Sequence, residues 1–301
     1  MQGLLLINKP KDITSFGAVA KVKWLCGTKR VGHTGTLDPM ATGVLPILVG
    51  RATLLSKYLL EADKEYIAGV RLGVTTDTLD ITGNVLYTNP VNINLSQLEK
   101  AAASFVGRIS QTPPMYSAIK KDGTPLYKLA RQGVEVERPS REVTINSLEI
   151  SNFDGCEFSM RVNCSKGTYI RSLAHDLGKA LGTGAVLISL ERVSTAGYKL
   201  EQCASLEELT KENVEKFLIS EERVVEHYPV VFVSQKQAIR FCNGGALALE
   251  RLPGLTKPQT DKIYRVKYKD IFLGLGVVDA EKTELKIECL INFVNNTDNK
   301  E

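Results

Sequence analysis

The spacing of apolar residues changes repeatedly along the first two thirds of the chain, and this predicts alternating strands and helices. Residues 3–8 form a short apolar run that is typical of a buried strand. Residues 66–72 and 158–164 alternate apolar and polar positions with a period of two, which predicts strands with one buried face. Residues 44–49 are again apolar and predict another strand.

Helical periodicity separates these strands. Ser15 is a suitable N-cap for a helix that Gly27 ends. Ser96 and Glu99 have the spacing of a capping box, which predicts a helix that continues to Val106. Mixed strands and helices of this kind predict an α/β (α+β) domain. The apolar stripes of the first helix and of a third one, beyond residue 167, comprise Ala18, Val19, Val22, Leu25 and Cys26, and Leu173, Leu177 and Leu181.

The pattern changes in the last quarter of the chain, where short strands and turns predict a second, smaller domain. Residues 264–268 and 271–278 have the pattern of paired strands in a small β-barrel. We therefore expect a catalytic domain over residues 1–228, a β domain over 229–295 and a frayed tail over 296–301. The predicted turns of the β domain are Asn243–Gly245, Pro253–Gly254 and Asp279–Glu281.

Composition places the chain among ordinary soluble globular proteins, since 43% of its 301 residues are hydrophobic and 24% are charged. No apolar run approaches the ~18 residues of a membrane span, and the N-terminus lacks the basic segment of a signal peptide. The six cysteines are scattered without a C-x-x-C pair, which argues against a zinc ribbon or a disulfide framework and favours a reducing cytoplasm. The net charge of +4 permits an RNA partner without requiring one.

No motif in the sequence predicts a cofactor. A phosphate-binding loop and a dinucleotide-binding G-x-G-x-x-G are both missing from the sequence. The three histidines are too far apart in sequence to indicate a metal site. We therefore expect chemistry that needs neither a metal, a nucleotide nor a redox group.

Asp38 is the outstanding candidate for chemistry, because it is the only carboxylate between Asp12 and Glu61. Nearby positive charge favours its ionised form, and Pro39 restricts its backbone to an extended conformation. The alternative is a glycine-rich surface turn that carries an Asp for solubility. The basic residues of the interval are Lys21, Lys23, Lys29, Arg30, Arg51 and Lys57, together with His33.

The segment around Asp38, GHTGTLDPMATGVLP (residues 32–46), closely resembles the signature of the TruB family of pseudouridine synthases, which modify position 55 of tRNA. Similarity to the family extends in the same order through most of the first 200 residues. The resemblance implies a pseudouridine synthase fold with a mixed, largely antiparallel sheet and flanking helices. The further similar blocks are INKPKDITS, DKEYIAGVRLG, TDTLDITG, PPMYSAIKKDGTPLYKLAR, SKGTYIRSLAHDLG and GAVLISLERVSTAGY.

The resemblance also implies roles for three residues at the reaction centre. Asp38 matches the catalytic aspartate, and Arg171 matches the arginine that pairs with it. Tyr66 matches a tyrosine that stacks on the uracil and helps to remove its C5 proton. From position alone, Arg171 would be a solvent-exposed helix residue and Tyr66 a strand residue that faces the core.

Five further residues match positions that surround the substrate in the family. Tyr169 and Leu190 match residues that line the pocket, and His33 matches a histidine near the extruded base. Asp80 either contacts Arg171 or the RNA, or caps a turn. Lys9 belongs to a Lys-Pro motif beneath the site, for which we expect a structural role.

Residues 113–141 are rich in Lys, Gly and Pro and lack regular periodicity. Composition alone is equally consistent with a solvated hairpin loop. The resemblance instead implies a thumb-like insert that closes over an RNA stem-loop. Its expected RNA contacts are Lys120, Lys121, Lys128 and Arg131.

The C-terminal segment resembles a PUA domain, an RNA-binding module, in its FLGLG string. Residues 229–295 carry ten Lys or Arg against seven acids, so +3 of the net charge lies there. We expect this domain to bind RNA through phosphate contacts.

The resemblance as a whole implies an enzyme that flips a T-loop uridine of tRNA out of its stack and isomerises it without a cofactor. We expect the tRNA T arm as the partner, no membrane, no obligatory protein partner, a monomer and a cytoplasmic location. One alternative is a guide-RNA-dependent relative that resembles dyskerin, which the thumb-like insert and the lack of long basic tails disfavour. The other is a non-catalytic tRNA chaperone, against which an intact Asp38, Tyr66 and Arg171 argue.

Overall fold

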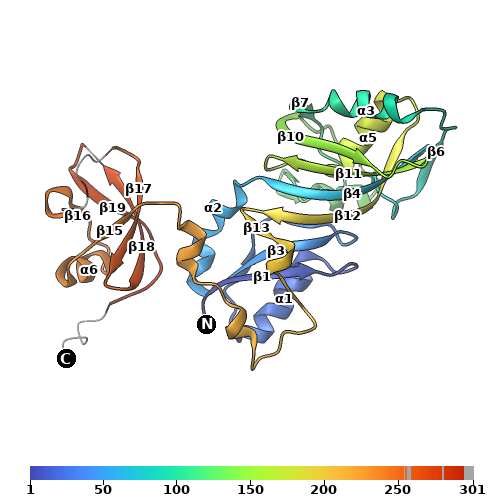
Figure 1. Cartoon of the computed structure of the whole chain (residues 1–301). Coiled ribbons are helices and arrows are strands. Elements are labelled where there is room, and N and C mark those ends of the chain that lie inside the picture. Colours follow the sequence, from blue (N-terminus) through green and yellow to red (C-terminus); the bar gives the residue numbers. More distant parts are fainter. Residues whose placement is uncertain (254, 256–258, 280, 295–301) are drawn as a thin grey trace.

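The computed structural model describes residues 1–253, 255, 259–279 and 281–294. It contains a large body built on one long sheet and a smaller C-terminal body built on another (Figure 1). Two of the predicted turns, Pro253–Gly254 and Asp279–Glu281, lie partly outside the described residues. The predicted tail, 296–301, lies outside them entirely.

The large body is organised on a ten-stranded sheet with the order β14-β1-β3-β12-β4-β11-β10-β7, to which β2 and β13 add at β3 and β12. Only β1–β14 and β3–β12 pair in parallel, and the other pairs are antiparallel. This confirms the mixed, largely antiparallel sheet. The strands are β1 (Gly3–Lys9), β2 (Val31–His33), β3 (Thr42–Val49), β4 (Lys64–Leu72), β7 (Gly107–Gln111), β10 (Arg141–Ser151), β11 (Glu157–Cys164), β12 (Ala185–Thr195), β13 (Tyr198–Lys199) and β14 (Ala204–Ser205).

Three helices cover one face of this sheet: α1 (Ser15–Cys26), α3 (Leu95–Ala103) and α5 (Ile170–Ala180). Strand β4 shows why, because its alternate residues Tyr66, Ala68, Val70 and Leu72 are all buried in the core that these helices share. The period-two prediction for β4 is therefore confirmed. Its other face is more open, as the 37% exposure of Ile67 shows.

The helix starts differ from the prediction by one or two residues. Thr14, not Ser15, caps α1, with its side chain accepting a hydrogen bond from the Gly17 N–H. The capping box of α3 pairs Asn94 with Gln97 rather than Ser96 with Glu99, and the helix ends at Ala103. Asn and Ser are comparable N-caps, so neighbouring candidates compete and sequence alone does not choose between them.

Residues 113–141 bridge β7 and β10 and are more regular than predicted. They form a small hairpin of β8 (Lys120–Lys121) and β9 (Thr124–Pro125), followed by the short helix α4 (Leu126–Arg131). Leu126 is buried, and hydrogen bonds from the N–H groups of Leu126 and Tyr127 to the carbonyls of Ile119 and Ser117 hold the start of α4 against the preceding segment of the insert. A second hairpin, β5 (Val74–Thr76) and β6 (Val85–Thr88), lies beside the far end of β12.

The C-terminal body is a strongly curled five-stranded sheet with the order β15-β17-β18-β19-β16 (Figure 1). The predicted pairing of residues 264–268 with 271–278 is confirmed as β17 with β18. The helix α6 was not predicted, although the capping box of Ser234 with Gln237 signals it. The elements are β15 (Val230–Phe232), α6 (Gln235–Cys242), β16 (Leu247–Ala248), β17 (Ile263–Tyr268), β18 (Ile271–Asp279) and β19 (Glu284–Leu290).

The two bodies share a hydrophobic cluster. Leu4 and Leu6 of β1 pack in it with Phe272, Leu275 and Ile291 of the C-terminal body. Two short segments after β3, η1 (Gly50–Leu55) and α2 (Ser56–Leu60), lie at this junction and add polar contacts. These are an ion pair of Lys57 with Glu288 and a hydrogen bond from Arg51 to the Leu290 carbonyl at 2.6 Å. None of the described helices combines the length and hydrophobicity needed to span a bilayer.

Candidate active site

The Asp38 loop connects β2 to β3 and is fixed on both sides of the aspartate. The Ser15 hydroxyl accepts from the Leu37 N–H at 2.8 Å and donates to the Leu37 carbonyl at 3.0 Å. On the other side, Lys9 Nζ donates to the Pro39 carbonyl at 3.3 Å. Ser15 was predicted as a helix cap, but its hydroxyl instead ties the start of α1 to the loop that presents Asp38.

Arg171, in the first turn of α5, pairs with Asp38 through two nitrogens. Its Nη2 donates to Asp38 Oδ1 at 3.1 Å, and its Nε lies 2.9 Å from Oδ2. The Arg171 side chain is 4% exposed and that of Asp38 is 33% exposed. The arginine is therefore a buried support rather than a surface residue, and the carboxylate remains open to a substrate.

Arg171 is itself held from several directions. Its Nη1 donates to the Thr78 carbonyl at 3.0 Å, and Nη2 donates to the Tyr116 carbonyl at 2.8 Å. A second carboxylate, Asp80, lies 3.6 Å from Nη1. Charge-assisted contacts of this kind give the guanidinium a single orientation.

Asp80 is buried and combines two of the roles considered for it. Its Oδ1 accepts hydrogen bonds from the Thr78 hydroxyl at 2.8 Å and from the Thr82 N–H at 3.0 Å, which closes the turn after β5. Its Oδ2 faces Arg171. The turn and the ion pair therefore belong to one network.

The pKa of Asp38 reflects opposing influences. Partial burial of the Asp38 carboxyl raises its pKa above the ordinary value, and the positive charge of Arg171 lowers it. The neighbouring Asp80 raises the pKa further, because a second negative charge disfavours ionisation. Arg171 is thus the group that most strongly favours the ionised form of Asp38 against the effect of burial.

Tyr66 lies on β4, directly across from Arg192 on β12. Arg192 was not singled out in the sequence, yet it is fully buried and donates to the Val44 carbonyl at 2.7 Å and to the Gly35 carbonyl at 3.1 Å. Burial raises the pKa of the Tyr66 hydroxyl, and a hydrogen bond and positive charge from Arg192 act against this. The sequence signal was a charged residue two positions after Leu190, and both residues are buried on β12 (Ala185–Thr195).

Tyr169 is the N-cap residue of α5, and its backbone is held by a fully buried glutamine that sequence reasoning also missed. Gln111 Oε1 accepts from the Tyr169 N–H at 2.8 Å, while Nε2 donates to the Tyr169 carbonyl at 3.1 Å. The Arg141 guanidinium lies over the Tyr169 ring at 4.8 Å. Because Gln111 and Arg141 flank the 113–141 insert, both of its ends meet at Tyr169.

His33 and Lys9 lie beneath the loop. Burial lowers the pKa of His33, as does the nearby charge of Arg192. Lys9 is fully buried, and burial lowers its pKa to about 8. Its ammonium donates to the carbonyls of Pro10 and Ile13, both at 2.8 Å, so this lysine connects β1, α1 and the Asp38 loop.

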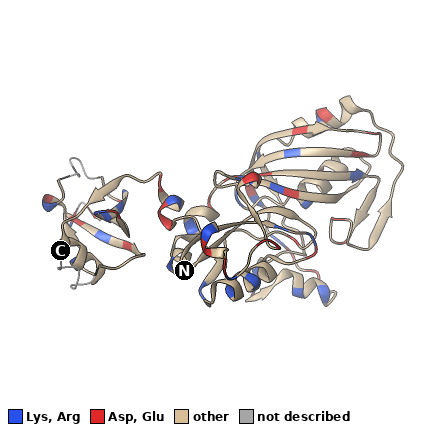
Figure 2. Cartoon of the chain, turned by 60° about the horizontal axis from the view of Figure 1, so that its bottom comes forward, with Lys and Arg blue, Asp and Glu red and all other residues tan. Residues whose placement is uncertain are grey.

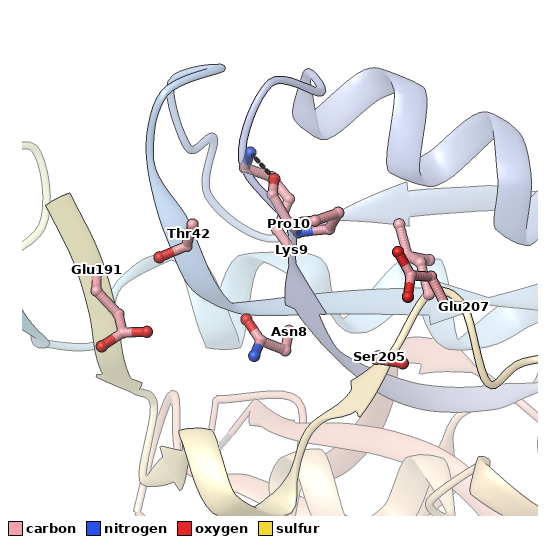
Figure 3. Close-up of a pocket in the computed structure, with 8 residues that line it drawn as sticks. Asn8, Lys9, Pro10, Thr42, Glu191, Ser205 and Glu207 are labelled. Carbon is pink, nitrogen blue, oxygen red and sulfur yellow. Dashed lines mark hydrogen bonds between the residues drawn. The ribbon is translucent and has the colours of Figure 1, made fainter. Parts of the chain in front are cut away.

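A cavity of about 300 Å³ adjoins Lys9, but Asp38 does not line it. Figure 3 shows two glutamates, Glu191 and Glu207, among its lining residues. Their charge disfavours phosphate, so this cavity is a poor entrance for RNA. Over the part of the chain that the structure describes, no three His, Cys, Asp or Glu side chains gather as a possible metal site.

The basic residues predicted to contact RNA are not gathered at Asp38. Lys120, Lys121, Lys128 and Arg131 are exposed on the 113–141 insert. The insert contacts the site where Arg171 donates to the Tyr116 carbonyl, and the Ser172 hydroxyl donates to the Thr112 carbonyl just before the insert at 3.0 Å.

Comparisons with known proteins agree with this geometry. Residues 23–170 match the model of the TruB family pseudouridylate synthase N-terminal domain, and residues 171–226 match that of the tRNA pseudouridylate synthase B C-terminal domain. The chain is 44% identical to tRNA pseudouridine synthase B of Clostridium kluyveri over 92% of this chain and 96% of that protein. It is 45% identical to the protein of the same name from Chromobacterium violaceum over 97% of this chain and 95% of that one.

A solved structure with the same fold is the crystal structure of a Cbf5-Nop10-Gar1 complex. It superposes with a TM-score of 0.71 at 26% identity, covering 96% of this chain and 84% of that one. The fold, together with the paired Asp38 and Arg171, defines a pseudouridine synthase, an isomerase. The chain belongs to the TruB family of these enzymes.

Proposed function

We propose that this protein converts one uridine in the T-loop of tRNA, position 55, to pseudouridine. The observation that carries the proposal is the Asp38 carboxylate, fixed by the buried Arg171 and yet open to a substrate. The name of its relatives, tRNA pseudouridine synthase B, supports tRNA as the substrate.

Asp38 is the catalytic residue of the reaction. The N1–C1′ bond of the uridine breaks, the uracil turns, and a new bond forms between C5 and C1′. The carboxylate either adds covalently to the nucleotide or removes the C2′ proton, and both routes require it to be ionised. Arg171 serves this requirement by opposing the rise in the pKa of Asp38 that burial causes.

The new C5–C1′ bond leaves a hydrogen on C5 that must be lost. Tyr66 is the residue that we assign to this step: its oxygen takes the C5 proton, and the electron pair of the C5–H bond restores the C5=C6 double bond. N1, freed from C1′, then takes up a proton from solvent. The ring of Tyr66 also provides a flat surface for the detached uracil. Tyr169, Leu190 and His33 form the rest of the pocket that keeps water away from the reaction.

The target base must leave its stack to reach Asp38. Extruding a base costs a few kcal/mol, and the cost is lower where stacking is already incomplete, as in a T-loop. Recognition is then expected from the shape and backbone of the T arm rather than from paired base edges.

In this proposal, two parts of the chain bind the RNA. The insert at 113–141 carries its exposed lysines over the stem-loop, and the C-terminal domain, 229–295, contributes phosphate contacts. Lysines and arginines occur in both bodies (Figure 2), and Lys21 of α1 is among the exposed ones. The catalytic domain comprises residues 1–228 and works as a cytoplasmic monomer without a protein partner or guide RNA.

The test is to incubate the pure protein with an unmodified tRNA transcript in excess EDTA and to map pseudouridine by chemical labelling and primer extension. We expect one modified position, in the T-loop, without added nucleotide, guide RNA or protein. The matched controls are the same transcript with cytidine at that position and the Asp38→Asn protein. Absence of pseudouridine, or modification of scattered uridines, contradicts the proposal.

A further inference from the structure

Arg192 is among the largest side chains that the fold buries completely. Its hydrogen bonds to the fold's backbone run to two carbonyl oxygens, those of Val44 and Gly35, rather than to a carboxylate. A buried guanidinium without a paired acid is costly, because the desolvation of its charge is not offset by an ion pair. We therefore expect a buried guanidinium of this kind only where its positive charge serves the function of the protein.

The position of Arg192 links two parts of the active site. Across the sheet it is the register partner of Tyr66, so the two buried side chains project from the same face of the sheet. It also holds the Gly35 carbonyl, three residues before Asp38. Gly35 has a φ of +111°, and an added Cβ would lie 3.4 Å from Arg192 Nη1, so a glycine gives the guanidinium access to the loop.

We propose that Arg192 is a positioning residue for Tyr66: it holds the hydroxyl oxygen at the uracil and stabilises the phenolate that removes the C5 proton. The inference rests on the proposed function and adds to it the group that makes Tyr66 an effective base. As the phenolate, Tyr66 takes the C5 proton while the C5–H pair forms the C5=C6 double bond, and N1, freed from C1′, takes up a proton from solvent. Tyr66 then releases its proton to solvent, which restores the phenolate with no net gain or loss of protons.

The charged groups around Tyr66 come from three elements. Arg192 of β12 favours the phenolate, whereas Cys164 of β11 and the Asp38 loop disfavour it, as does burial. Lys64 of β4 and His33 of β2 lie near Arg192. Burial lowers the pKa of both, and the charge of Arg192 lowers it further. Arg192 is therefore the one neighbour whose charge offsets the burial of the hydroxyl.

The experiment measures single-turnover rates with saturating tRNA whose uridines carry protium or deuterium at C5. Arg192→Met removes the charge and keeps much of the volume. We expect this variant to be slower by about 100-fold, the scale of general base catalysis, with an enlarged deuterium isotope effect. Its pH–rate profile should shift toward alkaline pH, because the phenolate then forms only at higher pH.

Two companion variants separate positioning from folding. Arg192→Lys keeps the positive charge but lacks the planar guanidinium with its several N–H donors. Its isotope effect should therefore lie between those of wild type and Arg192→Met. In a Tyr66→Phe background, Arg192→Met should slow the reaction little further, because both changes remove the same step. The control is Arg265→Met. Arg265 is a part-buried arginine of the C-terminal body, far from Tyr66 in the fold, that donates hydrogen bonds to the Tyr228 carbonyl and to Glu222. This change should lower thermal stability without changing the isotope effect.

Equal slowing at every pH with an unchanged isotope effect in both Arg192 variants overturns the proposal and leaves a structural role. If Arg192→Met is unfolded by circular dichroism, the isotope effect of Arg192→Lys decides the same question. Failure of the wild-type protein to form any pseudouridine would instead count against the proposed function, so the two failures are distinguishable.

Discussion

The Asp38 site and the 113–141 insert use charge in opposite ways. At the site, Arg171, Arg192 and Lys9 are buried, and each is fixed by hydrogen bonds to main-chain carbonyls. On the insert, Lys120 and Lys121 extend from a two-residue strand into solvent. The difference separates two tasks in the proposed function: buried charges hold one geometry for chemistry, whereas exposed charges are free to contact the phosphates of the proposed RNA substrate.

The largest expected effect sharpens the chemical side of this comparison. Asp38→Asn keeps the size of the side chain and removes its charge, so it should abolish pseudouridine formation while leaving tRNA affinity nearly unchanged. Single-turnover assays and filter binding measure the two quantities. Turnover within about tenfold of wild type, equivalent to ~1.4 kcal/mol of barrier, would show that Asp38 is not the catalytic residue.

Arg171→Lys comes next in size. Lysine keeps the positive charge but cannot contact both Asp38 oxygens, Thr78 and Tyr116 at once. We expect a single-turnover rate lower by roughly 100-fold, with tRNA affinity preserved. Near-equal rates for the two proteins would mean that the guanidinium geometry of Arg171 is dispensable. A positive charge alone would then suffice at the site, as it does for the exposed lysines of the insert.

The insert should respond in binding rather than in chemistry. Replacing Lys120 and Lys121 together by alanine should weaken tRNA binding by roughly tenfold and reduce the salt dependence of the dissociation constant by about two phosphate contacts. The single-turnover rate at saturating tRNA should remain close to that of wild type. A lower rate at saturation with unchanged affinity would reverse the assignment of roles.

The smallest effect concerns acidic pH. The reaction requires the ionised Asp38, and burial raises the pKa of this carboxyl. Protonation therefore begins at a higher pH than for an ordinary aspartate, and the single-turnover rate should fall as the pH is lowered through a midpoint above the ordinary value of 3.8. Circular dichroism at each pH controls for acid unfolding, and a midpoint below 3.8 would contradict the prediction.

Much of the core geometry follows from local sequence signals. The alternation at 66–72 fixes which face of β4 is buried, and the left-handed Gly27 ends α1 as predicted. Contacts between distant segments were inaccessible to that reasoning. Gln111 reaches Tyr169 and Arg192 reaches Gly35 across 58 and 157 positions of sequence, and no local pattern records such a distance. The resemblance to the TruB family supplied Asp38 with Arg171, but not these supporting residues.

The shared cluster at the junction has a consequence for how the chain is made. Leu4 and Leu6 are translated well before Phe272, Leu275 and Ile291, which cover part of the same cluster. During synthesis from the N-terminus, this side of β1 stays incompletely covered until those later residues have left the ribosome. A chain that stops at His227 keeps every proposed catalytic residue but leaves that apolar surface in water, so premature termination should yield an aggregation-prone product and not an independent enzyme.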